Sequence, residues 1–298
     1  KNLRNTARKG QTKHMDINQV ITGELGVKRW QVDAAVKLID EGNTIPFIAR
    51  YRKEVTGTLD DAQLRTLHER LMYLRNLEEK KEQVLASIEE QGKLTEELKK
   101  QILAAETMVV VEDLYRPYRP KRRTRAMIAK EKGLEPLAAL ITLQKAEKPI
   151  EVYAEEYVNP EKEVKSVKEA IDGAKDIIAE SVSDEADYRS WIRKATVQHG
   201  KVISQAKDEK AESVYEMYYD FEEPVTKLAG HRVLALNRGE KEKFLTVKIE
   251  APQDDILRYL EKKMIHSDNP HTTPILKEVA EDSYKRLIAP AIEREIRS

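Results

Sequence analysis

A long stripe of aliphatic residues dominates the first part of this sequence. Leu64, Leu67, Leu71 and Leu74 follow one another at steps of three and four, and the stripe continues through Leu77, Val84, Leu85 and Ile88. These steps put the side chains on one face of an α-helix, because the helix turns once every 3.6 residues. The stripe therefore predicts a long helix. We expect it to begin near Thr58, a residue type that caps helices, and to end at Gly92.

The composition favours helices in the rest of the chain as well. Charged residues make up 36% of the sequence, against about 25% in ordinary globular domains, and the 53 basic residues balance the 53 acidic ones. Leu, Ala, Glu, Lys and Arg are all good helix formers. Only 11 glycines and 11 prolines are present, which is low for an all-β protein. The sequence predicts a mainly α, multi-helical fold with well-solvated surfaces.

Several classes of protein are excluded by residues that the sequence lacks. It contains no cysteine, which excludes disulfides, cysteine-ligated metal sites and a cysteine nucleophile. No apolar run approaches the roughly 20 residues that a membrane helix needs. We expect a soluble, cytoplasmic protein. The zero net charge argues against a surface that coats nucleic acid everywhere, but a local basic patch still acts over about 8–10 Å.

The pattern changes along the chain and suggests three parts. Residues 1–14 are polar, basic and aperiodic, as expected of a leader or tag. Residues 15–199 carry helical periodicities. In residues 200–298, Lys201–Ala206 and Phe244–Ile249 alternate as strands do and predict a small antiparallel sheet. His231–Arg238 between them predicts a short helix capped by Gly239.

The most concentrated charge lies just after the long helices. Arg116–Lys132 holds eight basic residues and one acidic residue. Guanidinium groups pair with phosphates through two hydrogen bonds, prolines keep a segment extended, and tyrosines stack on bases. The candidate nucleic-acid contacts are Tyr115, Arg116, Tyr118, Arg119, Lys121, Arg122, Arg123 and Arg125. Two alternatives remain open: pairing of these cations with acidic helices of the same chain, and a protein interface.

A second basic cluster consists of Arg50, Arg52 and Lys53. In a continuous helix Arg50 and Lys53 would share a face, because they are three residues apart. The cluster either supports phosphate contact or forms a solvated face. The aromatic residues from Tyr215 to Phe221 favour a core over a stacking platform.

No constellation in the sequence argues for catalysis. The acidic pairs Asp60-Asp61, Glu222-Glu223 and Asp254-Asp255 have the positions of helix caps or solvated faces. His266 and His271 lack the carboxylate pattern of a metal site. None of the common nucleotide-binding or hydrolase motifs is present. We expect no enzymatic activity, no metal and no cofactor.

Several stretches resemble the Tex family of bacterial transcription accessory proteins. The first is GNTIPFIARYRKEVTG at Gly42–Gly57, and the second is Glu112–Tyr115 with PYRPKRRTR at Pro117–Arg125. The resemblance continues through Ala129–Leu137, His231–Glu240 and Tyr284–Leu287. It runs from about Met15 to the last residue and covers the N-terminal region of the family.

The resemblance implies more than these residues contain. Tex proteins continue into an RNase H-like domain, helix-hairpin-helix motifs and a C-terminal OB-fold domain, and they bind nucleic acid in transcription. The family's N-terminal region includes a helix-turn-helix-like part, which would correspond to residues 16–74. We expect a module that binds RNA or DNA without sequence preference, through the basic residues named above. The alternative is a helical scaffold that docks the downstream domains or the transcription machinery.

Overall fold

The structure, a computed structural model, describes residues 14–298 and divides the chain into two compact units, one ending at Tyr115 and one beginning at Arg116. Apart from His14, the expected leader lies outside the described residues. The expected boundary at residues 199 and 200 falls inside the second unit, and the three-part division stays a prediction. Within the described residues, no helix is both long enough and apolar enough to cross a membrane.

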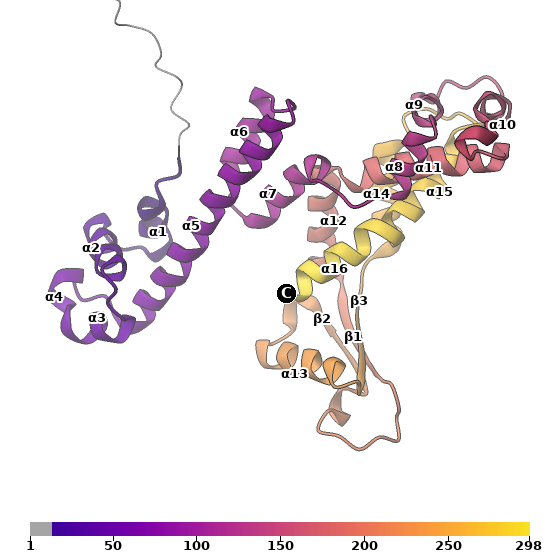
Figure 1. The fold of residues 1–298 in the computed structure, drawn as a ribbon. Coiled ribbons are helices and arrows are strands. Elements are labelled where there is room, and N and C mark those ends of the chain that lie inside the picture. The colour runs from indigo at the N-terminus through magenta and orange to yellow at the C-terminus, as the bar shows by residue number, and fades with distance from the viewer. Residues whose placement is uncertain (1–13) are drawn as a thin grey trace, which may run out of the picture. The chain divides into compact units, whose positions relative to one another are not determined.

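The first unit is helical (Figure 1). Its helices are α1 (Ile17–Leu25), α2 (Arg29–Asp40), α3 (Ile45–Tyr51), α4 (Lys53–Thr56), α5 (Asp61–Glu90), α6 (Glu96–Ala104) and α7 (Met108–Tyr115). The long helix predicted from the leucine stripe is confirmed as α5. Leu64, Leu67 and Leu74 are almost fully buried, and α1, α2, α3 and α7 pack along its length.

The start of α5 differs from the prediction. Asp60 caps the helix: its side chain accepts a hydrogen bond from the Gln63 backbone N–H at 2.7 Å, and the Gln63 side chain accepts one from Asp60 N–H at 3.0 Å. Thr58 is not the cap, because its backbone is left-handed with φ 65°, whereas a capping residue has an extended backbone. Gly57 before it is also left-handed, and it ends α4.

The second unit contains further helices and the sheet. In chain order these are η1 (Arg116–Tyr118), α8 (Arg125–Glu131), α9 (Glu135–Leu143), α10 (Ile150–Ala154), η2 (Glu155–Tyr157), η3 (Pro160–Lys162), α11 (Val167–Ser183), α12 (Ala186–His199), β1 (Lys201–Ala206), η4 (Glu216–Tyr218), β2 (Asp220–Pro224), η5 (Val225–Lys227), α13 (Gly230–Lys241), β3 (Leu245–Glu250), α14 (Gln253–Met264), α15 (Thr273–Asp282), the π-helical η6 (Ser283–Ile288) and α16 (Ala289–Arg297).

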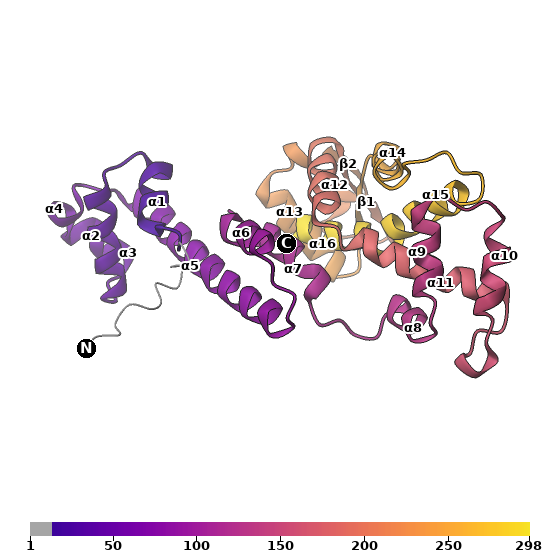
Figure 2. The same cartoon turned by 90° about the horizontal axis from the view of Figure 1, so that it is seen from above.

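Helix α11 is the centre of this unit. It contacts α8, α9, α10, α15 and η6, and Figure 2 shows α8, α9 and α15 around it. Small residues allow the close approach, since Ala170, Ala174 and Ala179 are fully buried. The large core of the unit is built from this helix and its neighbours.

The sheet has three antiparallel strands in the order β2-β1-β3. The predicted strands at Lys201–Ala206 and near Phe244–Ile249 are confirmed as β1 and β3, and β2 is an addition to the prediction. Tyr215 and Tyr218 are buried against Leu236 and Leu245, so the aromatic cluster belongs to a core. Helix α13 covers the sheet and runs past Gly239.

Gly239 does not cap α13, contrary to expectation. It lies inside the helix, where a Cβ would come within 2.5 Å of the Leu245 side chain. Glycine suits this position, because any larger residue would require the buried Leu245 side chain to shift. The predicted fold class, mainly α with one small antiparallel sheet, is confirmed.

Candidate nucleic-acid interface

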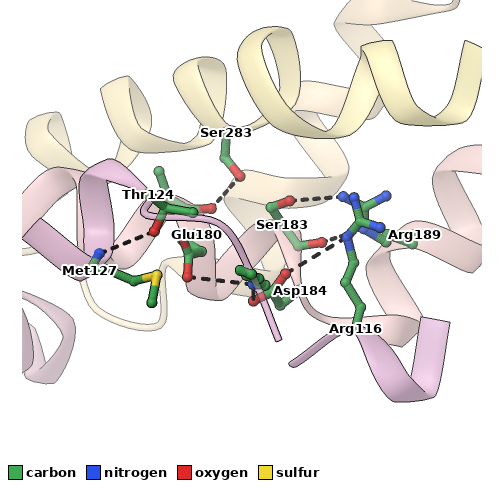
Figure 3. Close-up of polar contacts among 10 residues, drawn as sticks. Arg116, Thr124, Met127, Glu180, Ser183, Asp184, Arg189 and Ser283 are labelled. Atoms are coloured by element: carbon green, nitrogen blue, oxygen red, sulfur yellow. Dashed lines mark hydrogen bonds and ion pairs between the residues drawn. The ribbon is translucent and has the colours of Figure 1, made fainter. Parts of the chain in front are cut away.

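The basic segment, defined as residues 116–125, is fixed at both ends in the second unit. It begins with the 3-10 turn η1 and ends where α8 starts. At the second end, the Thr124 hydroxyl accepts a hydrogen bond from Met127 N–H at 3.1 Å, which caps α8 (Figure 3). The residues between these ends are neither helix nor strand.

The inner side of the basic segment is paired with α11. Lys121 donates to Asp184, the C-terminal cap of α11, and its ammonium nitrogen lies 3.4 Å from a carboxylate oxygen of Glu180. The Arg116 guanidinium lies 3.8 Å from Asp184 (Figure 3). Lys121 and Arg116 thus pair with an acidic helix of the same chain, which is one of the two alternatives that the sequence left open.

Their partners belong to an acidic stripe that the sequence analysis did not identify. Four carboxylates follow one another at steps of four along α11 and its C-terminal cap: Asp172, Asp176, Glu180 and Asp184. Steps of four place them along one side of the helix. Further along, burial raises the pKa of Asp176, and the positive charge of Arg125 is close enough to act against this increase. The basic segment thus runs along the acidic stripe. The four-residue spacing of the stripe's carboxylates is evident in the sequence.

Burial raises the pKa of two carboxyls of the acidic stripe, Asp176 and Asp184. Burial raises the pKa of the Asp184 carboxyl above its usual value, and the hydrogen bond and charge of Lys121 act against this increase. Burial also raises the pKa of Asp176, against the charges of Arg286 and Arg125. The Arg286 guanidinium lies 3.6 Å from Asp176. These two carboxylates lose part of their hydration, and the nearby cations favour their charged form.

A fully buried arginine supports the same corner. Arg189 on α12 is 0% exposed; it donates hydrogen bonds to the Ser183 carbonyl and, at 2.8 Å, to the Ser183 hydroxyl (Figure 3). Ser183 is the last residue of α11, where backbone carbonyls have no partner within the helix. Arg189 therefore holds the end of α11 that carries Asp184.

The basic segment also carries exposed arginines. Arg119, Arg122, Arg123 and Arg125 are all exposed. Arg123 is paired with Glu131 at 2.8 Å, but both side chains are more than half exposed, so this pair is weak. Arg122 has no ion-pair partner among residues 14–298. The segment therefore presents positive charge to solvent while its inner cations are neutralised.

The two candidate tyrosines are half-buried. The Tyr115 hydroxyl lies 2.8 Å from that of Ser87, and the Lys80 ammonium lies 5.9 Å from the centre of the Tyr115 ring. Both partners belong to α5 of the first unit. Tyr118 follows in η1. That these rings stack on bases stays a prediction.

The second basic cluster lies in the first unit, and its three residues are exposed. Arg50 is in the last turn of α3, and Lys53 begins α4. They do not share one helical face, because Arg52 between them leaves the helical conformation at φ −128°. Two of the cations lie over aromatic rings: Arg50 is 5.3 Å from the Tyr51 ring centre, and Arg52 is 5.0 Å from that of Phe47.

Three of the candidate carboxylates are paired with cations. Asp61 pairs with Arg65, Glu222 with Lys201, and Glu223 with Arg232, at 2.8–3.0 Å. In the part of the chain that the structure describes, no three His, Asp or Glu side chains are grouped to hold a metal ion.

Comparison with known proteins places these features in a family. A family model described as the Tex-like protein N-terminal domain matches residues 15–89, and one described as Tex central region-like matches residues 144–298. YdcI of Bacillus subtilis is 50% identical over 284 residues, which cover 94% of this chain and 40% of that protein.

Two other relatives carry informative names. The transcriptional accessory protein Tex of Neisseria gonorrhoeae is 44% identical over 246 residues, covering 81% of this chain and 32% of that protein. The human S1 RNA-binding domain-containing protein 1 is 30% identical over 299 residues, covering 95% of this chain and 30% of that protein. The chain thus spans two fifths or less of the length of these relatives.

Proposed function

Because this chain belongs to the Tex family of transcription accessory proteins, we propose that it is a nucleic-acid-binding part of such a protein. It binds RNA or DNA without sequence preference, through the outward-facing arginines of the basic segment. Contacts to phosphates position a protein on nucleic acid but carry no sequence information. The second basic cluster, Arg50, Arg52 and Lys53, adds phosphate contacts from the first unit.

One observation carries this proposal. Within a single short segment, Lys121 pairs with the acidic stripe, while the neighbouring Arg122 is exposed and has no ion-pair partner among residues 14–298. A segment used only for internal pairing has no need of exposed arginines on its other side. Fixing the backbone at η1 and α8 also reduces the entropy that these arginines lose when they bind phosphates.

Binding is measured as fluorescence anisotropy of labelled single-stranded RNA and double-stranded DNA across a salt series. The test variant is Arg119→Glu with Arg122→Glu. We expect weaker binding and a salt slope that is shallower by about 1.4 for single strands and about 1.8 for duplex, since each lost phosphate contact removes about 0.7 or 0.9.

The matched control reverses two exposed lysines elsewhere in the same unit, Lys241→Glu with Lys248→Glu. It changes the net charge by the same amount and should leave the slope nearly unchanged. Equal losses in the test and control variants would show that only overall charge matters, and would contradict a role for the basic segment.

The alternative function is a helical scaffold that docks downstream domains or the transcription machinery. The pairing of Lys121 and Arg116 with Asp184 favours it. A pure scaffold has no affinity for either nucleic acid at low salt but loses stability when Lys121 is changed. Measured binding by the unmodified chain would reject this alternative.

We propose no catalytic step for these residues. In support, Asp60 caps a helix, and Asp61, Glu222 and Glu223 are paired with cations. Incubation of the purified chain with RNA and DNA in the presence of Mg²⁺ is expected to leave both intact, as followed on a denaturing gel. Cleavage that persists through further purification would overturn this proposal.

A further inference from the structure

A groove between α12 and α14 combines aromatic rings with cationic side chains. It has a volume of about 560 Å³, within the range of ligand sites. Figure 2 shows the two helices next to each other, and they are in contact. The lining residues that matter here are Trp191, Lys194, Asp255, Arg258, Tyr259 and Lys262. The groove is not part of the basic segment.

Two stacked rings line this groove. Trp191 of α12 and Tyr259 of α14 lie parallel, with ring centres 3.9 Å apart and planes 1° apart. Trp191 is still 38% exposed, although a large aromatic residue gains by burial. The helices that carry the rings are held by Ile192 and Leu260, which are 0% exposed. Tyr259 thus covers one face of the Trp191 ring, and the part of Trp191 that stays exposed is held in place by the two helices.

The charge around the rings is mainly positive. Lys194 and Lys262 are exposed, and neither has an ion-pair partner among the residues that the structure describes. Arg258 pairs with Asp255, the one acidic residue of the lining. The Lys263 ammonium lies 5.8 Å from the centre of the Tyr259 ring. The groove thus suits a ligand that is anionic and also has flat rings.

We propose that this groove binds a single-stranded segment of nucleic acid. A base stacks on the exposed part of Trp191, and the adjoining phosphates contact Lys194 and Lys262. Single strands fit because their bases are free to stack on aromatic side chains, whereas duplex bases are stacked on one another. This inference rests on the proposed function and adds a second site, with a preference for single strands.

The two tryptophans of the chain make a direct test possible. Trp30 is 52% exposed on α2, so the variant Trp30→Phe leaves Trp191 as the sole tryptophan reporter in the full chain. Its emission is followed while oligo(U), oligo(dT) or an abasic oligodeoxynucleotide of the same length is added. We expect saturable quenching by the first two and little by the abasic strand, which keeps the phosphates but has no bases. Comparing oligo(U) with oligo(dT) shows whether RNA or DNA is preferred.

Variants of the lysines and of the tryptophan test which residues of the groove bind the oligonucleotide. The lysine variants are made in the Trp30→Phe chain. Lys194→Glu with Lys262→Glu should shift the quenching titration to higher concentrations, while Lys241→Glu with Lys248→Glu should not. For the ring, Trp191→Ala in a chain that also carries Arg119→Glu and Arg122→Glu should weaken oligonucleotide binding about 5- to 150-fold in anisotropy. The lysine variants keep the test decisive if loss of the Trp191–Tyr259 stack unfolds the unit.

The outcomes separate this site from the basic segment. Quenching that persists in an Arg119→Glu, Arg122→Glu variant supports the groove as a site of its own. If anisotropy shows binding but Trp191 emission is unchanged and the lysine variant binds normally, the groove proposal is overturned and the proposed function stands. If no oligonucleotide binds at low salt, both are overturned.

Discussion

Asp184 joins the basic segment to α11, and its ionisation can be measured directly. Burial raises the pKa of this carboxyl above its usual 3.8, and Lys121 gives the largest opposing contribution. We predict that Lys121→Met raises the Asp184 pKa further, because the hydrogen bond and the charge are lost together. The measurement is a titration of the side-chain carboxyl carbon by NMR, with an Asp184→Asn variant to assign the signal.

The raised pKa of Asp184 also predicts how the free energy of unfolding depends on pH. The folded chain retains the Asp184 proton over a pH range in which the unfolded chain has released it. The stability from this group is therefore present below pH 3.8 and is lost as the pH rises through the raised pKa. The free energy of unfolding of the unmodified chain, minus that of Asp184→Asn, should fall as the pH rises from 3.8. A difference that increases with pH would contradict the prediction.

Arg189 is predicted to be a major stabilising residue of the second unit. Replacing it with Met keeps apolar volume but leaves the Ser183 carbonyl and hydroxyl without their buried donor. Hydrogen bonds from a charged donor contribute about 1.5–3 kcal/mol each, so we expect a loss of about 3 kcal/mol in denaturant unfolding. Arg123→Met, at an exposed pair, should cost less than about 0.5 kcal/mol. Equal losses would contradict the structural role of Arg189.

Between elements, two adjacent residues of the basic segment should behave in opposite ways. Lys121→Glu places a third negative charge beside Glu180 and Asp184. We expect it to destabilise the second unit by about 2 kcal/mol, or roughly 4–8 °C in Tm. Arg122→Glu makes the same charge change on the exposed side, so it should leave the Tm nearly unchanged and weaken nucleic-acid binding. Circular dichroism melts and anisotropy test both; similar melts for the two variants would contradict the docking of the segment on α11.

Periodicity along the chain was enough to predict some elements, and not enough for others. The leucine stripe predicts α5 because both the period and the burial repeat along one helix. β1 was predicted with its observed bounds. β2 was missed, because its residues Asp220–Pro224 are mostly polar and alternate only between exposed and half-buried positions. The role of Gly239 depends on Leu245, which approaches it from another element.

The candidate site could be predicted only in part, because some of its contacts join elements that are far apart in the sequence. The basic segment is evident from composition, but which of its cations face inward depends on α11. The acidic stripe could have been identified from its steps of four, whereas its pairing with Lys121 could not. The stack of Trp191 on Tyr259 joins two helices that are separated in sequence by the whole sheet. Such contacts follow from tertiary packing, which no local pattern contains.

Across the whole chain, the placement of the cores indicates where it can be divided. The large core of the second unit includes Ala126 and Ile178 before residue 199, and Ile256 and Ile292 after it. Arg193 on α12 also pairs with Glu295 on α16 at 2.9 Å. A cut at residues 199 and 200 would therefore separate halves of one core. A cut after Tyr115 leaves this core complete.

This division predicts how fragments of the chain behave. Residues 116–298 should fold alone and melt cooperatively, because they keep the core, the basic segment and the groove. Residues 200–298 should not, because they lose α11 and α12, against which α14, α15 and α16 pack. Melts followed by circular dichroism test both fragments, and fragment 116–298 should retain oligonucleotide-dependent quenching of Trp191, its sole tryptophan. A fragment that shares its core with missing helices leaves too much apolar surface exposed to fold. A cooperative melt of residues 200–298 would therefore contradict the shared core and show that the sheet region is a domain by itself.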